Sequence, residues 1–283
     1  MLRLSPRTTE KIAFAIIWAG GIFALIILAF IIGYVLINGI SEISWDFLFT
    51  RPRGGISGEG GISSCIVSTI YLIALTLVIL ILPGIGAAIY LAEYARDNRL
   101  TRLIRFGVDT LAGVPSIIFG LFGFVLFVTA LGFNFSLLAG ALTLACLLLP
   151  TLIRTAEEAL KTVPRGDREA ALSLGATKWQ AIRYVILPAA FPGIITGIIL
   201  CVGRALGETA CLFVTVGSSV FTPQSPMDGG RPLALHVYYL MTDTNAWEKA
   251  MATATVLLVS IIIVNALTNW LSRRFQARMR GRK

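Results

Sequence analysis

Long apolar runs alternate with short charged segments along this chain. Runs of this length without a charged residue predict helices that cross a membrane. Five are present: Ile12 to Ile37, Gly60 to Ala92, Thr110 to Ile153, Tyr184 to Gly203 continuing through Val220, and Ala250 to Ser272. The third run would form a helix of roughly 66 Å, against about 30 Å of hydrocarbon, so we expect it to fold back near Gly132. The pattern therefore predicts six transmembrane helices.

Composition supports placement in a bilayer. Hydrophobic residues make up 56% of the chain, charged residues only 14%, and the mean hydropathy is +0.82. A soluble domain of this size could not cover so much apolar surface. The first run is too long and uninterrupted for a cleaved signal peptide, so we expect it to be retained as a helix.

Basic residues are distributed asymmetrically about the predicted spans. The side that holds both termini carries Arg3, Arg7, Lys11, Arg96, Arg99, Arg102, Arg105, Arg154, Lys161, Arg165, Arg168, Lys178, Arg183, Arg273, Arg274, Arg278, Arg280, Arg282 and Lys283. The opposite side carries only Arg51, Arg53, Arg231 and Lys249. The positive-inside rule therefore predicts an all-α integral membrane protein with both termini cytoplasmic. Topology and anionic lipid explain the net charge of +9, so we expect no nucleic-acid partner.

The spans and connections divide the chain into three parts. Residues 1–60 hold the first helix and an outer loop, 61–275 a five-helix core with a cytoplasmic loop at about 154–188, and 276–283 a basic cytoplasmic tail. The outer loops, 38–61 and 217–247, are rich in Gly, Pro and Ser and are predicted to be connectors, with an interfacial helix at Trp45 to Phe49. Residues 93–109 are amphipathic and should lie along the inner membrane surface. Pro115, at the start of the third span, permits a kink or a close helix crossing.

The cytoplasmic segment Glu169 to Pro188 predicts two short helices suited to docking. Asp167 can cap the first helix and Gly175 can end it. Thr177 and Gln180 can form a capping box for the second, and Pro188 should close that helix. Ala170 and Ala171 would allow close approach of another protein, while Leu172, Leu174, Trp179 and Ile182 offer apolar contact area.

Arg204 and Glu208 are the strongest polar signal inside an apolar run. As a helix they would lie one turn apart, and each charge costs about 2.5 to 3.5 kcal/mol at the bilayer centre. They form either a structural ion pair or, together with Thr209, part of a polar pathway. A purely structural ion pair could be replaced by apolar residues with little loss of stability, which favours the pathway. Arg204 would suit a tetrahedral oxyanion. Arg154, at the cytoplasmic end of the fourth span, is either a second positively charged residue along the anion pathway or a charge that only sets the topology.

Other reactive residue types offer no site. Cysteines 65, 146, 201 and 211 lie inside apolar spans without C-x-x-C spacing, so we interpret them as small hydrophobes. His236 is the only histidine, which excludes a multi-histidine metal site, and we expect it at the surface of the outer loop. No convergent catalytic set is present, so an enzyme is not expected.

Several segments together resemble a known family. Glu169-Ala170-Ala171, Gly175 and Leu187-Pro188 are similar to the EAA signature of ABC importer permeases, EAA-x3-G-x9-I-x-L-P, with Val185 in the Ile position. Leu91 to Gly123, Leu152 to Leu160 and Gly203 to Ala210 resemble the phosphate-specific importers, particularly the PstA-type subunit. The resemblance covers about Gly61 to Phe275.

The resemblance implies a non-catalytic permease subunit that forms half of a phosphate pathway in a bacterial or archaeal plasma membrane, the inner membrane in a Gram-negative cell. Implied partners are a second permease, a cytoplasmic ATPase dimer that uses ATP and Mg²⁺, and an external phosphate-binding protein. This chain has no G-x-x-x-x-G-K-[ST] motif, so we expect it to bind no cofactor itself. Glu169, Ala170, Ala171, Gly175, Leu187 and Pro188 would couple to the ATPase. A permease for sulfate or molybdate, the sister phosphate subunit, and a secondary transporter or channel are the alternatives.

Overall fold

The computed structural model describes residues 6–53 and 58–280, and within these ranges the regular elements are all helices. Arg3, Arg282 and Lys283 lie outside the described residues. Five described helices can span a membrane: Glu10–Ile40, Ser63–Tyr94, Leu137–Lys161, Lys178–Gly207 and Trp247–Trp270. A bent pair, Arg99–Ala112 with Ser116–Ala130, makes a sixth. The predicted all-α class with six spans is confirmed.

Three helices form the centre of the bundle: α3 (Ser63–Ile89), α6 (Leu137–Lys161) and α9 (Leu187–Gly207). Their shared core is apolar and fully or almost fully buried, with Leu72, Leu80, Leu144, Leu148, Leu152 and Cys201 among its members. Glycine permits the close approach of α9 to α6, because a Cβ on Gly193 would lie 2.5 Å from the Cβ of Ala159.

The third span is sharply bent. Helix α4 (Arg99–Ala112) meets α5 (Ser116–Gly123) at 101°, and π-helical η2 (Phe124–Ala130) continues α5. The bend falls just before Ser116, where Pro115 cannot donate a helical hydrogen bond. The predicted kink is confirmed, and the amphipathic α4 lies across the direction of α5, as an interfacial helix would. The chain then turns back at Gly132 and Asn134, both with positive φ.

The fifth span differs from its prediction at both ends. Helix α8 (Lys178–Ala181), π-helical η3 (Ile182–Ile186) and α9 run on as one helix, so the prediction that Pro188 closes a helix is wrong. Pro188 is tolerated because it lies in the first turn of α9, directly after the π-helical turn that rearranges the local hydrogen bonds. At the other end the helix stops at Gly207 instead of continuing toward Val220.

The outer face holds two helices beside irregular segments. The predicted interfacial helix is confirmed as α2 (Trp45–Phe49), capped by the Ser44 hydroxyl. A second helix, α11 (Leu233–Thr242), was not predicted. Its Leu233, Leu235 and His236 are buried, so the prediction that His236 lies at the surface is wrong. This segment was predicted to be part of a connecting loop. Its apolar residues instead form a helix whose side chains are buried in the protein.

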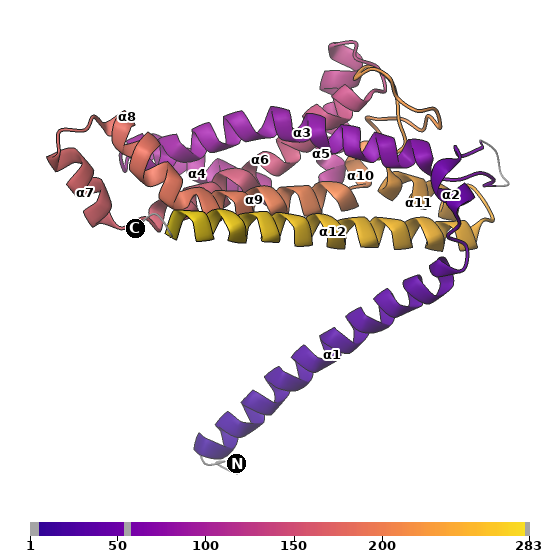
Figure 1. The fold of residues 1–283 in the computed structure, drawn as a ribbon, viewed down its shortest axis with the longest axis horizontal. Coiled ribbons are helices and arrows are strands. Elements are labelled where there is room, and N and C mark those ends of the chain that lie inside the picture. The colour runs from indigo at the N-terminus through magenta and orange to yellow at the C-terminus, as the bar shows by residue number, and fades with distance from the viewer. Residues whose placement is uncertain (1–5, 54–57, 281–283) are drawn as a thin grey trace.

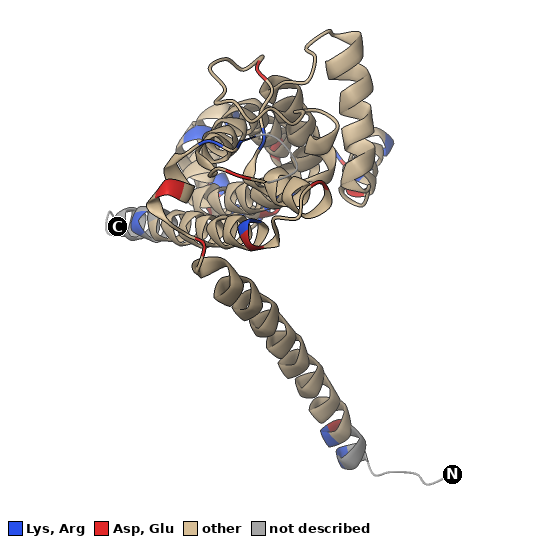
Figure 2. Cartoon of the chain, turned by 90° about the vertical axis from the view of Figure 1, so that its right-hand side faces the viewer, with Lys and Arg blue, Asp and Glu red and all other residues tan. Residues whose placement is uncertain are grey.

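The first and last helices lie side by side only where their outer ends meet (Figure 1). Helix α1 (Pro6–Ile40) diverges from the bundle, while α12 (Trp247–Arg280) runs along it and continues past residue 275 into the expected tail. Thr255 Oγ1 donates to the Val35 carbonyl at 3.1 Å. The most apolar stretch of α1 is wholly exposed, and Figure 2 shows almost no charge along it. This helix offers its surface to lipid or to another chain.

Candidate functional site

The cytoplasmic segment folds as two helices around a tight turn. Helix α7 (Arg165–Ser173) ends in a Schellman motif, in which the Ala176 N–H donates to the Ala171 carbonyl at 3.2 Å and the Gly175 N–H to the Leu172 carbonyl at 3.0 Å. Gly175 has φ +83°, a conformation that strains other residues. The capping box predicted at the start of α8 is present, joining Thr177 and Gln180 in both directions. The prediction of two helices separated by a turn at Gly175 is confirmed, but the second helix is the start of the long fifth span and is not short.

One predicted cap is wrong. The residue before α7 is Pro164, and Asp167 lies within the first turn, so it cannot act as the N-cap. Proline fixes the backbone angle needed to enter the helix and leaves Asp167 free to interact with the positive end of the helix dipole. Glu169 lies beyond this first turn and is exposed. Its position favours a contact with another protein over an interaction with the dipole of α7.

An apolar surface projects from this segment. We call it the coupling surface, and its exposed members are Glu169, Ala170, Leu172, Leu174, Gly175 and Trp179. Leu172, Leu174 and Trp179 are 49%, 89% and 55% exposed, and exposed apolar residues grouped in one segment are typical of a protein-interaction surface. Ala171 is buried and instead packs α7 onto the chain, while Leu187 and Pro188 are half-buried in the following helix. Ala170 is therefore available to another protein, whereas Ala171 packs within this chain.

Two cations of this segment contact the cytoplasmic end of the second span. Arg168 Nη2 lies 3.0 Å from Oε1 of Glu93, in π-helical η1 (Tyr90–Tyr94), and donates to the Leu160 carbonyl at 2.6 Å. Lys178 Nζ lies 4.7 Å from the centre of the Tyr94 ring. Glu93 is only 8% exposed. This carboxylate was not predicted as a contact residue, although it is the first charged residue after an apolar run and precedes a basic segment.

A neighbouring ionic cluster joins α4 to α6. Glu157 Oε1 lies 2.9 Å from Arg105 Nη2 and 2.6 Å from Lys161 Nζ, and Arg105 also donates to the Leu91 carbonyl. Arg154 pairs with Asp109 at 3.2 Å, with both side chains about half exposed. Arg154 thus lies beside a cavity of about 150 Å³ in this cluster, within reach of counter-charges. In this structure the Arg154 guanidinium links α6 to α4 through its ion pair with Asp109.

Arg204 and Glu208 lie where the fifth span breaks. Cys201 Sγ approaches the Leu148 carbonyl in the middle of α6, which places this end of α9 within the bundle. Glu208 follows the last helical residue in an extended conformation, and its Oε1 accepts from the Cys211 N–H at 3.5 Å at the start of α10 (Ala210–Phe213). Among the described residues no ion pair joins Arg204 to Glu208, and Arg204 is exposed. Thr209 is half-buried between α9 and α10.

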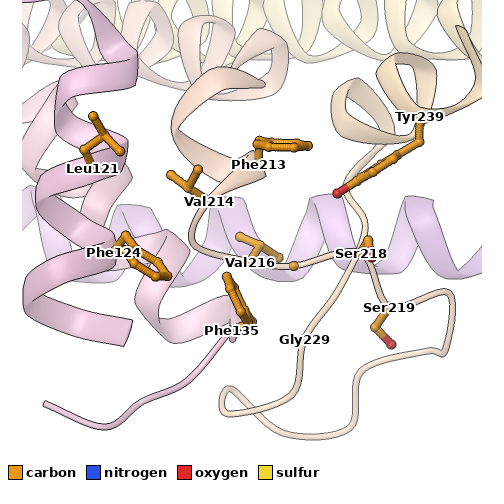
Figure 3. A pocket seen from close by; sticks show the side chains of 11 residues that line it. Leu121, Phe124, Phe135, Phe213, Val214, Val216, Ser218, Ser219, Gly229 and Tyr239 are labelled. Atoms are coloured by element: carbon orange, nitrogen blue, oxygen red, sulfur yellow. The ribbon is translucent and has the colours of Figure 1, made fainter. Parts of the chain in front are cut away.

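A cavity of about 590 Å³ opens beyond this break (Figure 3). Aromatic side chains from three segments line it, namely Phe124, Phe135 and Phe213, and the Tyr239 hydroxyl and two serines supply its polar positions. Neither Arg204 nor Glu208 is among the lining residues. Arg231 fastens the rim by donating twice to the Ser218 carbonyl, at 2.8 and 3.1 Å. The cavity was not predicted, because the residues that line it come from segments distant in sequence.

Comparisons with known proteins place this arrangement in context. The model of the family described as "Binding-protein-dependent transport system inner membrane component" matches residues 84–281. The "Probable ABC transporter permease protein YqgI" of Bacillus subtilis is 34% identical over 95% of this chain and 96% of its own length. The "Phosphate transport system permease protein PstA" of Haemophilus influenzae is 33% identical over 93% of each chain, and PstA 1 of Mycobacterium tuberculosis is 32% identical over 93% of this chain and 88% of its own.

Solved structures share the fold at low sequence identity. A bacterial ABC transporter that imports the acidic polysaccharide alginate superposes with a TM-score of 0.66, at 16% identity, over 95% of this chain and 99% of its own. The inward-facing MetNI methionine ABC transporter gives a TM-score of 0.62, at 20% identity, over 76% of this chain and 94% of its own. The helical arrangement is thus one used for unrelated solutes.

Proposed function

Because the chain belongs to the family of binding-protein-dependent transport system inner membrane components, we propose that it is the permease subunit of an ABC importer for inorganic phosphate. The observation that carries the substrate is the similarity to phosphate transport permeases over nearly the whole of both chains. Transport permeases of this kind move a solute and leave catalysis to another subunit. The chain therefore contributes half of a pathway and no reaction of its own.

The break of the fifth span supports an anionic solute. An exposed guanidinium in the membrane region cannot face lipid cheaply, since each such charge costs about 2.5 to 3.5 kcal/mol. Within the part of the chain that the structure describes, no carboxylate pairs with Arg204, so it needs water, a solute or a second subunit. A guanidinium fork matches two oxygens of a phosphate. Glu208, held at the start of α10, would limit how tightly an anion is bound.

Three surfaces fit three protein partners. The coupling surface fits a cleft in a cytoplasmic ATPase subunit, which as a dimer would bind ATP and Mg²⁺. The bare apolar side of α1 fits a second, homologous permease in the plasma membrane. The outer face around α2 and α11 is available to an external phosphate-binding protein. Closure of the ATPase would tilt the helices attached to α7 and α8 between inward-open and outward-open states.

The substrate is tested by reconstitution. The chain, its genomic-neighbour permease and ATPase are placed in liposomes with the neighbouring binding protein, and uptake of labelled phosphate is measured with ATP and Mg²⁺. We expect uptake that stops without ATP and is not reduced by excess sulfate or molybdate. Uptake of either competitor in place of phosphate would reassign the substrate, and uptake without the ATPase would indicate a secondary transporter.

The coupling surface is tested with Glu169→Lys and Gly175→Trp. We expect both variants to insert normally and to abolish uptake, because one reverses an exposed charge and the other forces a bulky residue into a left-handed turn. Copurification of a fully coupled ATPase with either variant would contradict the docking role. Ser173→Ala, on the same helix, is the control that should retain uptake.

A further inference from the structure

The loop that carries the coupling surface is attached along the chain to only two spans. Helix α7 follows α6 through Pro164, and α8 continues directly into the helix that contains α9. Motion imposed on α7 and α8 would reach these two helices through the backbone. The second span, α3–η1, has no backbone connection to the loop. Any force on it must pass through side chains.

Those side chains are present and come from both helices of the loop. Arg168 of α7 forms an ion pair with Glu93 at 3.0 Å, and Lys178 of α8 lies over the ring of Tyr94 at 4.7 Å. Glu93 and Tyr94 are consecutive and are the last two residues of η1. Both helices of the loop therefore contact the cytoplasmic end of the second span, α7 through Arg168 and α8 through Lys178.

Burial makes the Arg168–Glu93 contact more than a surface pair. The side chain of Glu93 is 8% exposed and that of Arg168 23% exposed, whereas the Asp97–Arg102 pair on the same face is 88% and 70% exposed and 3.9 Å apart. A buried carboxylate without its partner is unfavourable, so Glu93 should follow Arg168 when α7 moves. Arg168 also donates to the Leu160 carbonyl, which ties the same side chain to the last turn of α6.

We infer that Arg168 and Glu93 are positioning residues that transmit movement of the coupling surface to the second span, so that α3 moves with α6 and α9. This inference rests on the proposed function. The second span ends in the π-helical turn η1, a type of turn that is frequent at functional sites. The Lys178–Tyr94 contact adds a second hold at the same point.

The inference is tested in the reconstituted importer with Glu93→Gln, Arg168→Gln and the charge exchange Glu93→Arg/Arg168→Glu. Phosphate uptake and ATP hydrolysis are measured in the same vesicles, and subunit composition by size exclusion. We expect each single variant to assemble, to hydrolyse ATP, and to move at least fivefold less phosphate per ATP. The exchange should recover at least half of the ratio, and Arg102→Gln should leave it unchanged.

A wild-type ratio in both single variants would overturn the inference. So would a loss of uptake and hydrolysis together, in proportion to a loss of assembled complex, since that is the result of a merely structural contact.

A second measurement does not depend on the substrate. A cysteine introduced by Tyr90→Cys, at an exposed position of η1, is alkylated in the assembled complex with and without ATP trapped in the ATPase. We expect ATP to change its reactivity at least threefold, and Arg168→Gln to remove the change. An equal response in Arg168→Gln would overturn the inference, whereas failure of phosphate uptake with this response intact would overturn only the proposed substrate.

Discussion

Arg204 shows how one residue constrains what surrounds a membrane helix. The side chain is exposed in the isolated chain, and no carboxylate neutralises it within the described residues. Lipid cannot be its permanent neighbour at the membrane centre. A residue of this kind therefore identifies the side of α9 that faces water or another polar surface in the assembled importer.

We predict that Arg204→Gln abolishes phosphate uptake with assembly retained. Glutamine keeps hydrogen-bonding capacity but loses the charge and the bidentate fork that match an oxyanion. The measurement is labelled phosphate uptake in vesicles, with subunit composition as the control, and Arg204→Lys should retain partial uptake. Wild-type uptake by Arg204→Gln would remove this residue from the pathway.

His236 should make stability depend on pH. Burial, with a smaller effect from Arg231, lowers the pKa of His236 from 6.5 to about 3. Between these values the unfolded chain holds a proton that the folded chain lacks, so the free energy of unfolding falls by about 1.4 kcal/mol per pH unit as the pH drops. Thermal unfolding in nanodiscs from pH 7 to 5 should show a shallower decline for His236→Gln. Equal slopes would show that folding does not lower the pKa of this imidazole.

At the scale of elements, glycines set how closely the core helices pack. A Cβ at Gly193 would meet the Cβ and Cα of Ala159 at 2.5 and 3.4 Å, atoms that cannot rotate away. A Cβ at Gly86 of α3 would meet nothing within 4 Å.

We predict that Gly193→Leu destabilises the protein and Gly86→Leu does not. Overpacking of a close helix pair costs about 1 to 3 kcal/mol, so the melting temperature in nanodiscs should fall by several degrees for the first variant. The second variant serves as the matched control in a helix of the same core. Equal melting temperatures would show that α6 and α9 can separate without loss.

Most elements could be predicted from the sequence because their signals are local. Charge-free runs located the spans, Gly175 located the turn between α7 and α8, and Pro115 located the bend. The failures came from signals whose effect depends on neighbours. Pro188 lies in a helix that a π-helical turn adjusts, and α11 is stable because the bundle buries it. Arg168 and Arg105, which pair with Glu93 and Glu157, are distant from them in sequence, so only the fold brings these pairs together.

At the scale of the whole molecule, the chain is incomplete by itself. The core helices bury one another, but α1 presents its apolar surface on all sides and contacts the bundle through α12. The aromatic cavity and Arg204 are likewise open to whatever lies beside the chain. A second permease would cover these features together.

We predict that α1 contacts this second permease. Phe23, near the middle of α1, is 65% exposed, so Phe23→Cys is available for cross-linking to a neighbouring chain. In membranes that hold both permeases, a bifunctional thiol reagent should give a heterodimer of cross-linked subunits. Val78→Cys, at an exposed position of α3, is the control, because cross-linking through this residue as well would mean that the reagent joins any exposed cysteines in the membrane. Cross-linking of Phe23→Cys only to other copies of this chain would contradict the prediction.

The contact between the first and last helices also has a consequence for biosynthesis. The Thr255 hydroxyl that bonds the Val35 carbonyl is 220 residues further along the chain. At roughly 5 to 20 residues per second, α1 must wait about 10 to 40 s in the bilayer before its partner in α12 has been translated. Because α1 carries almost no charge beyond its first turns, it is stable in the bilayer on its own during this time. The surface that is open to partners in the finished chain is therefore also the one that allows α1 to insert first.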